Sequence, residues 1–145
     1  MSTSLYESDF YAWANEQAAL LRAGKLSAAD IENIAEEIES MGRSEKRELI
    51  SRLTVLLMHL LKWRHQPGGR CTSRQLTIEV QRQDVADHLA DNPSLKAKLS
   101  ETMESAYSRA RLNAAKETSL STTVFPTACP WPFEQLMGEG FWPED

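Results

Sequence analysis

The sequence predicts an all-α fold: a compact bundle of about five helices with an irregular C-terminal strap rich in proline and tryptophan. Apolar residues recur at steps of three and four in five successive stretches, which is the spacing of one face of an α-helix. No stretch shows the strict apolar–polar alternation that is typical of a half-buried strand. A chain of 145 residues has the usual length of one domain, so we expect a single helical-bundle domain over residues 1–145.

The first helix is predicted to begin after Ser8 or Asp9, because either side chain can accept hydrogen bonds from the free N–H groups of a helix start. Gly24 can end this helix, since glycine readily adopts the left-handed conformation that follows many helices. The apolar positions between these limits follow a helical period and are Phe10, Trp13, Ala14 and Leu21. We expect this apolar side to face the core.

The second helix is predicted to begin at Ser27, where Ser27 and Asp30 have a spacing similar to that of a capping box. Its other side is acidic. The apolar side, expected to face the core, comprises Ile31, Ile34, Ala35, Ile38 and Met41. Gly42 either separates this helix from the next or merely bends one long helix, and the sequence leaves both alternatives open.

The third helix, at about residues 44–64, is the most hydrophobic. Apolar residues surround it almost completely, which predicts a helix enclosed by its neighbours. Its main apolar line contains Leu49, Leu53, Leu56, Leu60 and Trp63, with Ile50, Leu57 and Leu61 beside it. A turn is predicted at residues 66–69, where proline and two glycines follow one another.

A fourth helix is predicted at about residues 73–89, and a fifth from Asn92-Pro93, with Asn92 as the cap and Pro93 in the first helical position. Three alanines at four-residue steps would allow another helix to approach the fifth closely. Residues 125–143 are predicted to form an extended strap with one helical turn near residues 134–137. Its aromatic side chains, which could cover this chain's own core or a neighbour's surface, are Trp131, Phe133, Phe141 and Trp142.

Four polar residues fall where a simple core would have leucine, and His59 lies at the flank of the apolar line of the third helix; the four are Gln17, Arg82, Asn113 and Glu117. Burying an unpaired charge is costly, so we expect these residues to find partners. We predict that Arg74 pairs with Glu117, and Arg82 with a carboxylate such as Glu37. The favoured interpretation is a satisfied structural network that fixes the register of the helices.

The alternative interpretation is a binding or catalytic site between helices. Its candidate polar cluster comprises Glu37, His59, Gln81 and Arg82, with Trp63 as an apolar wall.

Charge is unevenly distributed along a chain whose net charge is -5. Residues 1–40 contain eight acids and two bases, whereas residues 41–82 contain three acids and nine bases. A basic group around the Gly68-Gly69 turn could hold an anion or an acidic partner. Its members are Lys62, Arg64, Arg70 and Arg74, with His65 beside them. The favoured alternative is a solvated helix end that pairs with the acidic second helix.

Other classes of function find little support. No Glu-x-x-His pair of the kind found in carboxylate-bridged metal bundles occurs, and no metal or other cofactor is expected. The acidic chain lacks aromatic residues within its basic region, which disfavours nucleic-acid binding. No apolar run reaches the roughly 20 residues of a membrane helix. The absence of a signal-like N-terminus predicts a cytoplasmic location, where Cys71 and Cys129 are expected to remain thiols.

Several short motifs together are similar to those of one bacterial family. They are Tyr6-x-x-Asp9-Phe10-x-x-Trp13, Glu36-Glu37-Ile38-x-Ser40-Met41-Gly42, His59-Leu60-Leu61-Lys62-Trp63-x-x-Gln66-Pro67, Thr77-Ile78-x-x-Gln81-Arg82, Glu117-Thr118 and Phe125-Pro126-x-x-Cys129-Pro130. With these motifs the chain resembles the family known as domain of unknown function 29, across almost its entire length. The resemblance implies an α-helical bundle and no established activity, ligand or catalytic residue.

The sequence therefore favours a cytoplasmic interaction or regulatory module over an enzyme. We expect its partner to be another protein, with self-association, for example as a homodimer. The alternative is an enzyme or a binder of a small ligand or anion that uses the candidate polar cluster.

Overall fold

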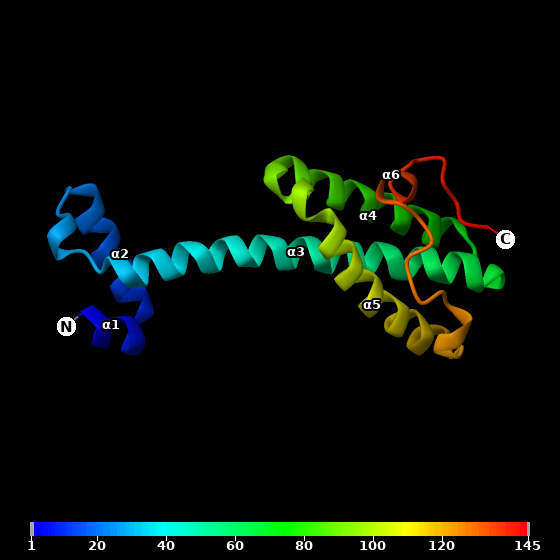
Figure 1. Cartoon of the computed structure of the whole chain (residues 1–145), viewed down its shortest axis with the longest axis horizontal. Coiled ribbons are helices and arrows are strands. Elements are labelled where there is room, and N and C mark those ends of the chain that lie inside the picture. The colour runs from blue at the N-terminus through cyan, green and yellow to red at the C-terminus, as the bar shows by residue number, and fades with distance from the viewer. Residues whose placement is uncertain (1, 145) are drawn as a thin grey trace. The chain divides into compact units, whose positions relative to one another are not determined.

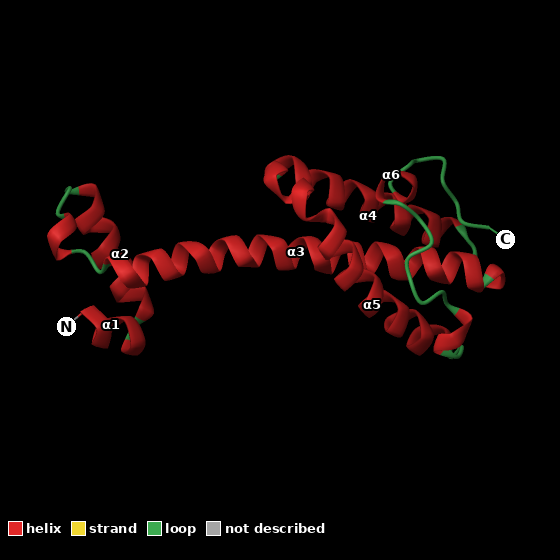
Figure 2. Ribbon diagram, viewed as in Figure 1, coloured by secondary structure: helices red, strands yellow, loops and turns green. Residues whose placement is uncertain are grey.

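The structure is a computed structural model that describes residues 2–144. All regular secondary structure in this range is helical, which confirms the all-α class (Figure 2). The chain divides into two compact units, Met1–Ser44 and Glu45–Asp145. Helix α3 (Ile31–His65) runs through both units, so a single domain over the whole chain stays a prediction (Figure 1).

The first unit contains a short helix that the sequence analysis missed, α1 (Ser2–Ser8), followed by α2 (Phe10–Arg22) and the start of α3. Asp9 caps α2 as predicted, with its Oδ1 accepting a hydrogen bond from the Ala12 N–H at 3.1 Å. Gly24 follows the helix with a φ of 73°, the left-handed conformation that glycine tolerates best. Asp9 therefore begins α2 and Gly24 follows its end, as their residue types predict.

Helix α3 begins at Ile31 rather than at Ser27. Residues Leu26–Ala28 form a single 3-10 turn, and the Asp30 N–H donates to Gln17 Oε1 at 2.7 Å. Gly42 neither ends nor interrupts the helix, which continues to His65. The two predicted helices on either side of Gly42 are thus one.

The predicted apolar side of the second helix does not enter a core. Ile31, Ile38 and Met41 remain 51%, 63% and 67% exposed. Among the described side chains of residues 5–44, only Trp13 and Gln17 are buried. The prediction of a core-facing stripe is therefore wrong for Ile31, Ile38 and Met41, whereas Ile34 is half-buried.

The second unit contains the core. Six leucines of α3 are fully buried here, which confirms the prediction for residues 44–64. They are Leu49, Leu53, Leu56, Leu57, Leu60 and Leu61. Helices α4 (Thr72–Asp91) and α5 (Leu99–Thr118) supply Ile78, Val85, Ala106 and Ala110 to the same cluster. The alanines at four-residue steps thus lie in the core, where the sequence analysis expected close helix packing.

Helix α5 starts later than its sequence signal suggests. Pro93–Lys98 is a 3-10 segment, and the Asn92 side chain makes no cap bond to it. The Asn92 amide instead donates to the His88 carbonyl oxygen at 3.1 Å. The predicted cap therefore closes the end of α4 and does not open α5.

The C-terminal strap, residues 125–143, lies against the core of the second unit, with one short helix, α6 (Phe133–Leu136). Phe125, Trp131 and Leu136 are buried in the core. The strap aromatics therefore cover this chain's own core. No helix in the described part of the chain is long and apolar enough to cross a membrane.

Candidate functional site

The residues of the predicted polar cluster are divided between the two units. Glu37 lies in the first unit, where its carboxylate accepts a hydrogen bond from the Tyr6 hydroxyl. His59, Trp63, Gln81 and Arg82 lie on α3 and α4 of the second unit. The predicted pairing of Arg82 with Glu37 is wrong, because each has found a different partner.

Arg82 holds the strap. Its Nε donates to the Leu136 carbonyl oxygen at 2.9 Å, and its Nη2 donates to the Phe141 carbonyl oxygen. The guanidinium also lies over the Trp142 ring, 5.0 Å from the centroid, and that ring packs 4.9 Å from Trp63. Burial lowers the pKa of Arg82, although Glu79 and Glu139 act in the opposite direction. Carbonyl oxygens, and not the predicted carboxylate, thus accept the hydrogen bonds of this buried cation.

Lys62 is the partner of Glu117, so the predicted Arg74–Glu117 pair is also wrong. The Lys62 Nζ lies 2.9 Å from Glu117 Oε1, and only 11% of the Lys62 side chain is exposed. The hydrogen bond from Lys62 lowers the pKa of Glu117. His59 is near this pair, and burial, with a contribution from Lys62, lowers its pKa. His59 is therefore uncharged at neutral pH and lies beside the Lys62–Glu117 ion pair.

Three of the four cationic side chains in the predicted anion patch bind partners within this chain. Arg70 donates from Nε to the Trp63 carbonyl oxygen at 2.7 Å and from Nη2 to that of Arg64 at 3.4 Å, so it caps the end of α3. Arg74 donates to Gln66 Oε1 at 3.1 Å, and Lys62 is paired as described. Anion binding at this turn stays a prediction.

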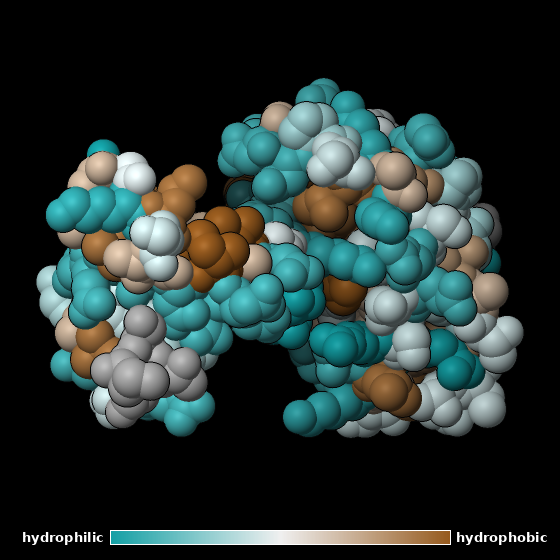
Figure 3. All heavy atoms as spheres, turned by 60° about the vertical axis from the view of Figure 1, so that its left-hand side comes forward, coloured by the Kyte–Doolittle hydropathy of each residue, from teal (hydrophilic) through white to brown (hydrophobic). Residues whose placement is uncertain are grey.

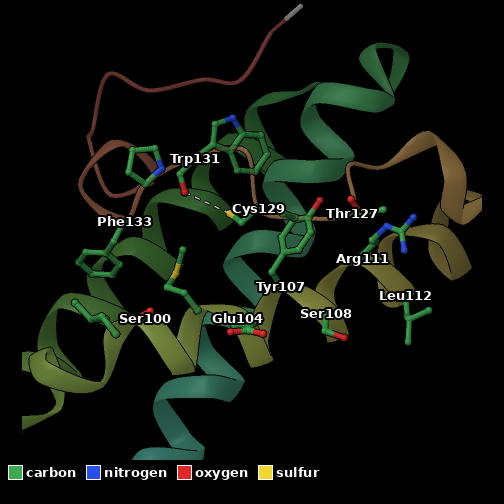
Figure 4. Close-up of a pocket in the computed structure, with 14 residues that line it drawn as sticks. Ser100, Glu104, Tyr107, Ser108, Arg111, Leu112, Thr127, Cys129, Trp131 and Phe133 are labelled. Atoms are coloured by element: carbon green, nitrogen blue, oxygen red, sulfur yellow. Dashed lines mark hydrogen bonds between the residues drawn. The ribbon is translucent and has the colours of Figure 1, made fainter.

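A groove of about 780 Å³ lies between α5 and the strap (Figure 4). No sequence pattern predicts this groove, because it depends on where the strap returns over α5. Helix α5 lines it with Met103, Glu104, Tyr107 and Arg111, and the strap with Thr127, Cys129, Trp131 and Phe133. Most of its exposed lining is apolar.

The polar groups of this groove fasten the strap. The Tyr107 hydroxyl donates to the Pro126 carbonyl oxygen at 2.6 Å, and Arg111 Nε donates to that of Phe125 at 3.1 Å. The Cys129 thiol donates to the Trp131 carbonyl oxygen at 3.3 Å, the bond drawn in Figure 4. Burial raises the pKa of Cys129 and that of Tyr107, the latter to about 12. The thiol is therefore protonated near neutral pH, and the groove is suited to apolar contact rather than nucleophilic chemistry.

The first unit presents a different kind of surface. We define the α3 stripe as Ile31, Ala35, Ile38, Met41 and Gly42. At about 100° per residue, all except Met41 project within roughly 60° of one another, and Met41 adjoins Ile38. Each of these residues is exposed, and Figure 3 shows hydrophobic residues gathered over this part of residues 1–44. Two exposed acids, Glu32 and Glu39, border the stripe, and a third, Glu36, lies farther round the helix.

A polar network fixes the orientation of the α3 stripe. Asp30 Oδ2 accepts hydrogen bonds from Trp13 Nε1 at 3.1 Å and from Asn33 Nδ2 at 2.8 Å. The Asn33 amide, followed by Trp13, lowers the pKa of Asp30 despite some desolvation. The hydrogen bond to Glu37 raises the pKa of Tyr6 to about 12. Because α1 and α2 are bonded to Asp30 and Glu37, Ile31 and Ile38 are left on another side of the helix.

The described residues contain no group of three or more His, Cys, Asp or Glu side chains placed to hold a metal ion. The model of the family described as Domain of unknown function DUF29 matches residues 5–142. Comparison with curated proteins and with solved structures finds no match. The residues of the six family-like motifs hold each unit together: Tyr6 and Trp13 in the first, Lys62, Arg82 and Glu117 in the second. The chain belongs to the family of domain of unknown function DUF29.

Proposed function

We propose that this chain is a protein-interaction module that binds another protein through the α3 stripe. The observation that carries the proposal is the exposure of Ile31, Ile38 and Met41, at 51%, 63% and 67%, along one helix. Single exposed apolar residues are common on protein surfaces, whereas contiguous ones mark interaction sites. The cytoplasmic location expected from the sequence is part of this proposal.

Burial in the first unit supports the same conclusion. A segment of about 40 residues can form only a small core of its own. Of the described side chains in residues 5–44, only Trp13 and Gln17 are buried. Covering the stripe would remove apolar surface from water, which contributes about 25 cal/mol for each Å² buried. A partner would thus supply burial that the unit lacks by itself.

A second candidate function is the binding of a small apolar ligand in the groove between α5 and the strap. Its volume of about 780 Å³ lies within the range of known ligand sites. Native mass spectrometry of the purified chain tests this candidate: a retained small molecule that a Met103→Trp variant loses would support it.

The interaction function is tested by purifying the tagged chain from its native cell and comparing two aspartate variants. Ile38→Asp places a charge in the α3 stripe, and Leu76→Asp changes an α4 residue that is 54% exposed. We expect a co-purifying protein that the original chain and Leu76→Asp retain and Ile38→Asp loses. A second, differently tagged copy of the chain in the same cell reports self-association, the other expectation from the sequence. The same set of co-purifying proteins for all three chains would contradict the proposal.

A further inference from the structure

We infer that the segment which docks on the α3 stripe is a basic amphipathic helix of another protein. This inference rests on the proposed function and adds the chemistry of the partner. It follows from the shape of the stripe, from the positions of its small residues and from the charges beside it.

The shape of the stripe fits a helix. Its apolar members occupy positions separated by three, four and seven residues along a continuous α-helix, which makes a ridge that the groove of a second helix can accept. Helix-in-groove recognition uses the same spacing on the partner, so both helices can bury one apolar side.

Gly42 gives a second reason to expect a closely packed helix. Glycine lowers helix stability, and nothing in the fold requires one here: a Cβ at Gly42 would meet no atom within 4 Å. Ala35, seven positions earlier, is also small and exposed. Small residues on the same side of a helix let a neighbouring backbone approach, because the distance between helix axes depends on the side chains at the contact.

The charges beside the stripe favour a basic partner. Glu32 and Glu39 border it, and Glu36, farther round the helix, is paired with Arg43 at 3.0 Å. Residues 1–44 contain eight acids and three bases in all. Lysine or arginine beside the apolar positions of a partner helix would meet this border, whereas acids there would be repelled. A second copy docked through the same segment would bring two acidic surfaces together, so we commit to a different, basic protein.

The test uses two synthetic helical peptides of equal length with identical leucine positions, one with lysine and the other with glutamate at the remaining positions. Fluorescence anisotropy measures their binding to the full chain. We expect the lysine peptide to bind at least about tenfold more tightly, and its affinity to fall as salt screens the charges.

Variants separate docking on the stripe from general attraction to an acidic protein. Ile38→Asp makes the chain more acidic, so non-specific attraction would strengthen lysine-peptide binding, whereas docking on the stripe predicts a loss of about tenfold or more. The triple variant E32Q/E36Q/E39Q should weaken binding and flatten its salt dependence. Leu76→Asp should leave the affinity unchanged.

Three results would overturn the inference: equal binding of both peptides, tighter binding of the glutamate peptide, or an Ile38→Asp chain that binds as tightly as the original. A dimer of this chain in sedimentation that Ile38→Asp dissociates would overturn it as well, because the occupant would be a second copy. If Ile38→Asp loses a cellular partner while the lysine peptide fails to bind, the interaction function stands and only the basic-helix inference fails.

Discussion

Arg82 Nε, on α4, donates a hydrogen bond to the Leu136 carbonyl oxygen of the strap at 2.9 Å. The same guanidinium reaches the Phe141 carbonyl oxygen and lies over the Trp142 ring. One side chain, only 5% exposed, thus fixes two points of an extended segment that has few regular backbone hydrogen bonds of its own. The strap closes over the core because a charged donor satisfies its buried carbonyl groups.

Arg82→Leu should lower the free energy of unfolding by about 3 kcal/mol, because buried carbonyl groups lose charged donors and no other partner replaces them. Arg82→Lys keeps the charge but offers no planar fork, so we expect an intermediate loss. Urea unfolding followed by tryptophan fluorescence measures both effects. An Arg82→Leu chain as stable as the original would show that these bonds do not hold the strap.

The Lys62–Glu117 pair should respond differently to the loss of each member. Glu117→Gln leaves the Lys62 charge largely buried without its counter-ion, whereas Lys62→Met removes the buried charge itself. We therefore expect Glu117→Gln to be the more destabilising change. The hydrogen bond from Lys62 lowers the folded-state pKa of Glu117, so its contribution is full above about pH 4.5 and is lost as the pH falls through the lowered pKa. The difference in unfolding free energy between the original and Glu117→Gln should shrink below pH 4.5, and a constant difference would contradict this explanation.

His59 should make the chain sensitive to mild acid. Burial, together with Lys62, lowers its folded-state pKa below the ordinary value of 6.5, so the unfolded chain takes up a proton first as the pH falls. The stability that this neutral histidine contributes is complete above pH 6.5 and is lost between that pH and its lowered pKa. Chemical unfolding of the original and of His59→Gln between about pH 7 and pH 5 compares the two slopes. The original should lose more stability over this interval, and parallel curves would argue against a depressed pKa.

Gly42→Ala should separate stability from binding. Alanine is favoured over glycine inside a helix by roughly 0.5–1 kcal/mol, and the added methyl group meets nothing within 4 Å. We expect a more stable first unit that binds the lysine peptide less tightly, because the methyl group keeps the partner backbone at a distance. Hydrogen exchange at residues 31–44 measures the first effect and anisotropy the second. A variant that is stabilised and binds as before would remove the packing role assigned to Gly42.

The sequence predicted the second unit better than the first. The leucine run between Leu49 and Leu61 is apolar on nearly every side, and only a helix enclosed by others suits such a pattern. In the first unit the same rule failed: Ile31 and Ile38 have a helical apolar period, and yet they remain exposed. The helical period shows which side of a helix is apolar. The surface that covers this side need not belong to the same chain.

The contacts of two polar residues were predicted, but their partners were not. Arg82 and Glu117 are polar residues on apolar lines, and both make contacts between elements. The predicted partner of Arg82 was a carboxylate, whereas Arg82 binds carbonyl oxygens of a strap whose path depends on tertiary packing. Nothing in the order of residues indicated where the strap would return, and the groove over α5 was missed for the same reason.

The most direct test of the α3 stripe as a docking surface is photo-crosslinking in the native cell, with a photoreactive amino acid at Ile38 and, as the matched control, at Leu76. Both positions are exposed helix surface, at 63% and 54%. We expect a discrete covalent adduct with another protein from position 38 and none from position 76. Equal crosslinking from both positions, or none from position 38, would contradict it.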